Sequence, residues 1–120
     1  MKTMMIAGAF ALSLASAAPA LAQDLEPQSK ADMQCFASLA YLGGQVGEDS
    51  PDMAGLAGGM MYYLGRLEGR SPGVDWLGRL ETYLTSIDEA ELESHLERCG
   101  NELSVKGAAL VAWGDSVDGE

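Results

Sequence analysis

Residues 50–69 read SPDMAGLAGGMMYYLGRLEG, and this stretch indicates how the chain folds. Its apolar residues recur at intervals of three or four positions, which predicts an amphipathic helix. They are Met53, Leu56, Met60, Leu64 and Leu67. Ser50, Pro51 and Asp52 favour a helix start, because Ser caps the helix end, Pro suits the first position and a carboxylate matches the helix dipole.

A second stripe of the same predicted helix consists of glycines. Its members are Gly55, Gly58, Gly65 and Gly69, with Tyr62 in the middle. At about 100° per residue they lie within roughly 80° of one another around the helix axis. Because each glycine costs a helix about 1 kcal/mol relative to alanine, the strip calls for a reason. It is either a tolerated solvent face, a surface for close helix packing, or a groove for a ligand or partner.

The segment from Tyr62 to Arg70 is the most positive and aromatic part of an acidic chain. Tyrosine and arginine are the residue types that anchor interfaces. The interaction surface predicted from these patterns comprises Gly55, Gly58, Tyr62, Gly65, Arg66, Gly69 and Arg70. The alternative is structural: Tyr63 lies in the core and the arginines pair with nearby acids.

Helices are also predicted on both sides of this segment. The first runs from Lys30, with Ser29 as its cap, to the glycines at 43 and 44. The third follows the break at residues 71–73, and its apolar residues are Val74, Leu77, Leu80 and Leu84.

The fourth predicted helix begins at a capping box formed by Ser86 and Glu89. Its apolar face comprises Leu92, Leu96, Cys99 and Leu103, and the series continues through Gly107, Leu110 and Trp113. Gly100 and Gly107 are places where this helix would kink or end.

No stretch alternates apolar and polar residues, so the expected fold is all-α: a small four-helix bundle stapled by one disulfide. We expect one helical domain over residues 30–114, a flexible leader over 23–29 and an acidic, frayed tail over 115–120. Residues 1–22 have the features of a secretory signal peptide: Lys2, an apolar run, and the small residues of Ala20-Leu21-Ala22 before the cut. The run is shorter than the roughly 20 residues of a spanning helix, which disfavours an uncleaved anchor. The expected location is the bacterial periplasm or the exterior.

Cys35 and Cys99 are the two cysteines of the chain. In an oxidising compartment an even count favours a disulfide, here one closing a loop of most of the mature chain. By loop entropy such a bridge contributes roughly 4 kcal/mol. The alternatives are free or intermolecular thiols. Redox catalysis is disfavoured because the C-x-x-C motif is absent from the sequence.

The chain has 18 Asp and Glu against 7 Lys and Arg, a formal net charge of −11. This surface repels phosphate, which argues against nucleic acid and anionic membranes as partners. We expect no enzyme, no cofactor and no metal, because no nucleophile, zinc-protease or phosphate-loop motif occurs. Glu91, His95 and Cys99 share a helix face and suit zinc in type, but a surface histidine beside a carboxylate is the simpler interpretation.

Three segments carry a resemblance to known families: DMQCFASLAYL around Cys35, GMMYYLGRLEG from Gly59 to Gly69, and LERCGNEL around Cys99. The chain resembles small helical periplasmic proteins of the HdeA/HdeB acid-stress chaperone type. It is also similar to amidase-immunity proteins of the Rap/Tai type, and to exported bacterial families that imply no activity. The chaperone resemblance implies a dimer at neutral pH that opens in acid to expose apolar surface.

The leading expectation is an exported, non-enzymatic helical protein that binds another protein. The first alternative is an acid-activated periplasmic holdase that binds unfolded clients. The second is an immunity-type inhibitor of a secreted enzyme. A homodimer is compatible with each of these, and no membrane insertion is expected after signal cleavage.

Overall fold

The structure, a computed structural model, describes residues 25–119, so the predicted signal peptide lies outside the described residues. This part of the chain forms four helices and no strand. They are α1 (Pro27–Val46), α2 (Met53–Arg70), α3 (Trp76–Ser86) and α4 (Glu89–Asp118). The all-α fold with four helices and a Cys35–Cys99 disulfide is therefore confirmed. None of the four helices is long and apolar enough to cross a membrane.

The first helix begins earlier and ends later than predicted. Pro27 occupies its first turn, where a missing N–H costs nothing, and Lys30 N donates to the Glu26 carbonyl at 2.9 Å. Ser29 is not a cap but a buried residue within the helix. The predicted leader over 23–29 was therefore wrong for its last three residues. The helix passes both glycines at 43 and 44 and ends at Val46, directly before Gly47, whose φ is 82°.

Aspartates stand immediately before α2, α3 and α4. Before α2, the Asp52 N–H donates to Ser50 Oγ at 3.2 Å, so Ser50 closes a turn three residues before the helix; the prediction of Ser50 as the cap was wrong, because Asp52 holds that position. Asp75 caps α3 by accepting from Gly78 N at 3.0 Å, and Asp88 caps α4 by accepting from Glu91 N at 2.9 Å. The predicted capping box was wrong because Ser86 is the last residue of α3.

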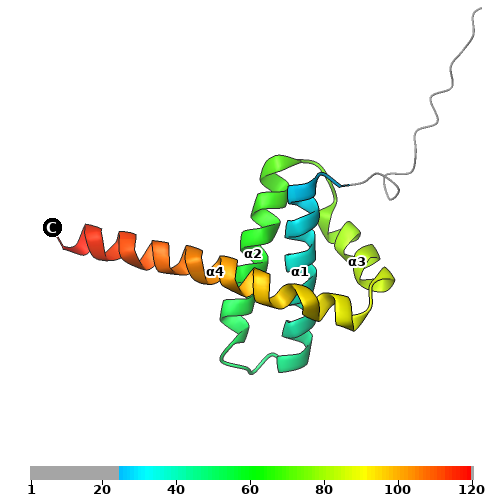
Figure 1. Cartoon of the computed structure of the whole chain (residues 1–120), viewed down its shortest axis with the longest axis horizontal. Coiled ribbons are helices and arrows are strands. Elements are labelled where there is room, and N and C mark those ends of the chain that lie inside the picture. Colours follow the sequence, from blue (N-terminus) through cyan, green and yellow to red (C-terminus); the bar gives the residue numbers. More distant parts are fainter. Residues whose placement is uncertain (1–24, 120) are drawn as a thin grey trace, which may run out of the picture.

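The helices are arranged around α1 (Figure 1). Two of them flank it: α2 runs antiparallel beside α1, and α3 lies on its other side. The fourth helix begins near the end of α3, crosses α1 and α2 at a steep angle, and continues beyond α2. We call α1, α2 and α3 the body of the protein. The first part of α4 therefore lies over the body, and its last part lies outside it.

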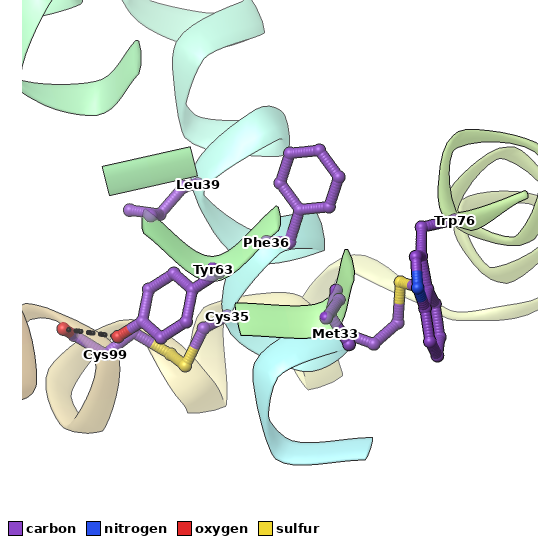
Figure 2. Packing of buried hydrophobic residues seen from close by; sticks show 8 residues of the cluster. Met33, Cys35, Phe36, Leu39, Tyr63, Trp76 and Cys99 are labelled. Carbon is purple, nitrogen blue, oxygen red and sulfur yellow. Dashed lines mark hydrogen bonds between the residues drawn. A yellow bond between two sulfur atoms is a disulfide. The ribbon is translucent and has the colours of Figure 1, made fainter. Parts of the chain in front are cut away.

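The core lies where α4 crosses the first two helices (Figure 2). Tyr63 of α2 is fully buried there, as the structural alternative predicted, and its hydroxyl donates to the Cys99 carbonyl at 3.2 Å. The buried cluster comprises Met33, Cys35, Phe36, Leu39, Tyr63, Leu67, Trp76 and Cys99. A second bond ties α4 to α1, because Ser38 Oγ donates to the Leu92 carbonyl at 2.8 Å.

The fourth helix is a single element of 30 residues. It runs without a break through Gly100 and Gly107, so the kink considered at these glycines does not occur. Residues 115–118 belong to it, so the prediction of a frayed tail over 115–120 was wrong for these four. Most of the helix after Leu103 is exposed.

Candidate functional site

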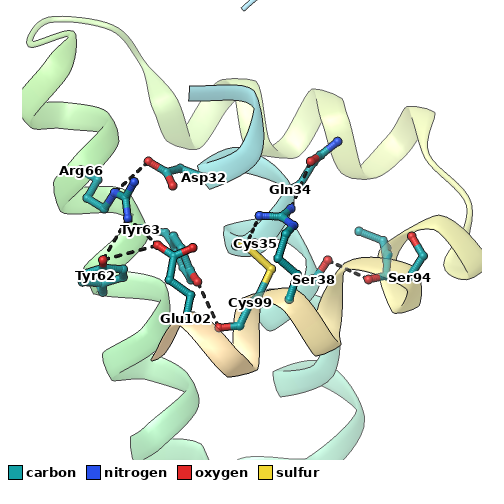
Figure 3. The surroundings of a disulfide bond; sticks show 12 residues. Asp32, Gln34, Cys35, Ser38, Tyr62, Tyr63, Arg66, Ser94, Cys99 and Glu102 are labelled. Atoms are coloured by element: carbon teal, nitrogen blue, oxygen red, sulfur yellow. Dashed lines mark hydrogen bonds and ion pairs between the residues drawn. A yellow bond between two sulfur atoms is a disulfide. The ribbon is translucent and has the colours of Figure 1, made fainter. Parts of the chain in front are cut away.

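The disulfide joins the middle of α1 to α4 (Figure 3). Its Cα atoms are 5.4 Å apart, and the two cysteines are fully buried. Arg98 lies over the bridge, donating to Cys35 Sγ at 3.3 Å and to Gln34 Oε1 at 3.2 Å. The crossing point of α4 on α1 is thus held by a covalent bond and by side-chain hydrogen bonds.

Asp32 is a charged residue buried beside this crossing. Only 2% of its surface is exposed. Arg66 Nε lies 3.1 Å from Asp32 Oδ2, and Arg70 forms an ion pair with the same oxygen. Arg70 Nε also donates to Ser29 Oγ at 3.2 Å. Because an unpaired buried carboxylate is costly, these arginines supply the charge that lets Asp32 lie in the interior.

Arg66 has further partners within the chain (Figure 3). It forms an ion pair with Glu102 and donates to the Tyr62 hydroxyl at 2.9 Å. It also donates to Gln28 Oε1 at 2.9 Å, and its guanidinium carbon lies 5.4 Å from the centre of the Tyr62 ring. The predicted surface residues Tyr62, Arg66 and Arg70 are thus brought together, with intramolecular roles. Their use by a partner stays a prediction.

The glycine strip of α2 faces away from the rest of the chain. Gly55, Gly58, Gly65 and Gly69 are exposed, and a Cβ built at each would meet no atom within 4 Å. The interpretation that another helix of the described chain packs closely against this strip is therefore wrong. The other two interpretations of the strip, a solvent face and a groove for a separate partner, stay open. The glycine that does lie in a helix contact is Gly59, which the sequence analysis did not single out.

Burial changes the ionisation of two side chains near the crossing. Desolvation raises the pKa of Tyr63 to about 12, with Glu102 adding to the effect. Desolvation, followed by the charge of Arg98, lowers the pKa of His95, while Glu91 opposes the shift. His95 Nε2 is buried and has no hydrogen-bond partner among the described residues.

The residues considered for zinc do not form a metal site in the described part of the chain. Cys99 is bound to Cys35 and is not a free thiolate. No group of three His, Cys, Asp or Glu side chains is placed to hold an ion within residues 25–119. His95 instead lies between Arg98 and Glu91 on one helix.

The part of α4 beyond the body is the largest unpartnered feature of the described structure. We call residues 104–118 the α4 arm, which extends about 22 Å at 1.5 Å per residue. Its large apolar side chains are exposed: Val105 69%, Leu110 67%, Val111 64%, Trp113 66% and Val117 52%. Elsewhere in the described chain, exposed apolar residues of this size are scattered singly: Val46, Met61 and Leu77.

An open hollow lies at the base of the α4 arm, where α4 leaves α2. It is lined by Tyr62, Arg66, Lys106 and Leu110. Two of these side chains are cationic, whereas the tip of the arm carries the carboxylates of Asp115 and Asp118. Because Arg66 is paired with Asp32 and Glu102, the arm has one unpaired cation, Lys106, near the body and acidic residues at its far end.

Sequence reasoning did not identify the arm as a site. It placed Gly107, Leu110 and Trp113 on the continued apolar face of a bundle helix, which implied burial. The length of the last helix is the feature that could have revealed the arm, because α4 has 30 residues, whereas α1 has 20 and α3 has 11. A helix that outruns its neighbours has no intramolecular surface for its last turns.

The comparisons with known proteins add no relative to this picture. No protein-family model, no curated protein and no solved structure matches the chain.

Proposed function

We propose that this protein is an exported, non-enzymatic protein-binding module whose binding element is the α4 arm. The observation that supports the proposal most strongly is the exposure of four large apolar side chains, Leu110, Val111, Trp113 and Val117, on one side of a projecting helix. Since burying a Val or Leu side chain removes about 60–120 Å² of apolar surface from water, four of them present on the order of 240–480 Å². A contiguous patch of that size marks an interaction site more often than a plain surface.

The body of the protein is built to hold this helix in place. Cys99 and the Tyr63–Cys99 hydrogen bond fix α4 about one turn before the arm begins. Because an arm on a rigid base loses less conformational entropy when it binds, this anchoring favours association. The disulfide and the signal-like residues 1–22 both favour work in an oxidising compartment outside the cytoplasm.

The chemistry of the arm favours a protein partner over nucleic acid or membrane. Lys106 is the single basic residue among residues 104–118. Phosphate backbones and anionic lipid surfaces attract helices rich in Lys and Arg, and the whole chain carries a net charge of −11. An apolar helix face with few charges instead suits a second apolar helix or groove.

Site-specific photo-crosslinking tests the proposal. A benzophenone amino acid is placed at Leu110 in the secreted, oxidised protein, and the cells that produce it are irradiated. The matched control carries the same group at Leu77, which is 59% exposed on α3, away from the arm. We expect discrete crosslinked protein adducts from position 110 and none from position 77. Equal patterns at the two positions would remove the arm as a binding element.

The acidic composition of the chain favours a second candidate function, an acid-activated holdase. In strong acid the negative charge of the 18 Asp and Glu is lost, and the positive charges that remain repel one another and destabilise the compact state. Loosening at the crossing of α4 would expose the apolar cluster beneath α4, which is the surface a holdase needs.

Light scattering from malate dehydrogenase at pH 2–3 tests the second candidate, with and without the oxidised protein. Suppressed aggregation would support holdase activity. Unchanged scattering, together with near-ultraviolet circular dichroism that persists at pH 2, would rule it out.

A further inference from the structure

We propose that the partner of the α4 arm is a second copy of this chain, with the two arms packed antiparallel. The inference rests on the proposed function, because it takes the arm as the binding element and names what the arm binds. Each arm would then cover the apolar face of the other, with its tip at the base of its partner.

The arm presents an apolar stripe suited to another helix. Leu103, Gly107, Leu110, Gly114 and Val117 lie within about 80° of one another around the helix axis, at 100° per residue. The first of them packs on Gly59 inside the body, and the stripe then continues outside it. Val111 and Trp113 flank the stripe on opposite sides, so an opposing helix would be covered from both edges.

The available area matches a modest dimer. Two arms that each present on the order of 240–480 Å² would bury a total of about 480–960 Å². This range lies below that of standard stable interfaces and is typical of weak, transient ones. We therefore expect a reversible dimer whose population depends on concentration.

Charge determines the direction in which the arms pack. Lys106 lies at the base and forms no ion pair among the described residues, whereas Arg66 beside it is already paired with Asp32 and Glu102; the tip contains Asp115 and Asp118. The carbonyl groups at the C-terminal end of α4 add negative charge to the tip. Antiparallel arms bring each acidic tip to the turn that carries Lys106 in the other copy. Parallel arms would instead place the acidic tips side by side.

The bodies favour the same direction. The start of α4 is acidic, with Glu89, Glu91, Glu93 and Glu97. In an antiparallel pair centred near residue 112, these starts lie at opposite ends, at least about 45 Å apart at 1.5 Å per residue. Since the Debye length is about 8 Å at physiological salt, their repulsion is screened there. A parallel pair would hold the two acidic bodies together.

Analytical ultracentrifugation over a range of protein concentrations is the first test. We expect a monomer–dimer equilibrium for the oxidised protein. Leu110→Asp should weaken dimerisation roughly 100-fold or more, because each dimer loses two buried leucines. The matched control Leu77→Asp alters an exposed leucine of α3 and should leave the equilibrium unchanged.

Charge reversal tests the antiparallel direction. Lys106→Glu makes the base more acidic, and the double variant Asp115→Lys/Asp118→Lys makes the tip basic. Each variant alone should dimerise about three- to tenfold more weakly, as expected for a few exposed charge pairs. Their mixture should form heterodimers that recover the original affinity. A control mixture of Lys106→Glu with Glu48→Lys/Asp49→Lys, altered in the α1–α2 loop, should show no recovery.

The outcomes separate this inference from the proposed function. A protein that stays monomeric at millimolar concentration, yet crosslinks from position 110 to a different chain, overturns the homodimer and keeps the binding arm. A monomer without such crosslinks overturns both. A dimer that Leu110→Asp does not weaken, or whose charge variants fail to recover on mixing, overturns the antiparallel arm pairing.

Discussion

Leu103 of α4 lies directly against the backbone of Gly59 in α2. A Cβ built at Gly59 would be 2.7 Å from Leu103 Cδ1 and 2.9 Å from Leu39 Cδ1, closer than carbon atoms pack. The absence of a side chain at this position is what allows α4 to cross α2 so closely. This contact also sets the point at which α4 leaves the body and becomes the arm.

Gly59→Ala should lower the free energy of unfolding by about 1–2 kcal/mol, because two leucine methyl groups must move and the gain in helix propensity does not compensate. The matched control is Gly58→Ala, next to it on the exposed side with no atom within 4 Å of the new Cβ. That variant should gain about 0.5–1 kcal/mol from helix propensity. Urea unfolding measures both, and stabilisation by both variants would contradict the packing at Gly59.

Asp32→Asn should destabilise the protein by about 1.5–3 kcal/mol, because it removes the charged acceptor that Arg66 and Arg70 share, while both arginines stay partly exposed to water. Glu68→Gln is the control, since Glu68 is exposed on the same helix as the arginines and has no ion pair among the described residues. It should change stability by less than about 0.5 kcal/mol. Similar melting temperatures for the two variants would show that the buried pair contributes little.

Replacing both cysteines by serine should destabilise the fold by roughly 4 kcal/mol, the loop-entropy value for a bridge of this span. The bridge has a sequence separation of 64 and ties α1 to α4. Differential scanning calorimetry of the oxidised protein, the reduced protein and the double variant measures the effect. Indistinguishable melting would contradict a structural role for the bridge.

His95 should make stability depend on pH. Desolvation and Arg98 lower its pKa in the folded state below the ordinary 6.5, so the unfolded chain takes up a proton at a higher pH than the folded chain does. This contribution is fully present above pH 6.5 and is lost as the pH falls through the folded-state value. The free energy of unfolding should decrease more steeply from about pH 7 to pH 5 than in His95→Gln. Parallel pH profiles for the two proteins would refute the assignment.

Local sequence patterns determined much of this fold. Apolar spacing predicted four helices, and the two cysteines predicted the bridge that joins the first to the last. These features could be predicted because helix periodicity and chain breaks depend on residues only a few positions apart in the sequence. Boundaries were less accurate, since Asp52 and Asp88 rather than the predicted Ser50 and Ser86 stand at the N-cap positions of α2 and α4.

The tertiary structure decided what each helix face does. The glycines of α2 at 55, 58, 65 and 69 share spacing and composition with Gly59, yet α4 crosses only at Gly59. Arg66 and Arg70 had the features of surface residues until the fold placed Asp32 between them. The sequence by itself determined which residues form helices and which cysteines join. The crossing of α4 determined which faces are buried and which turns become the arm, because burial depends on contacts between segments far apart in the chain.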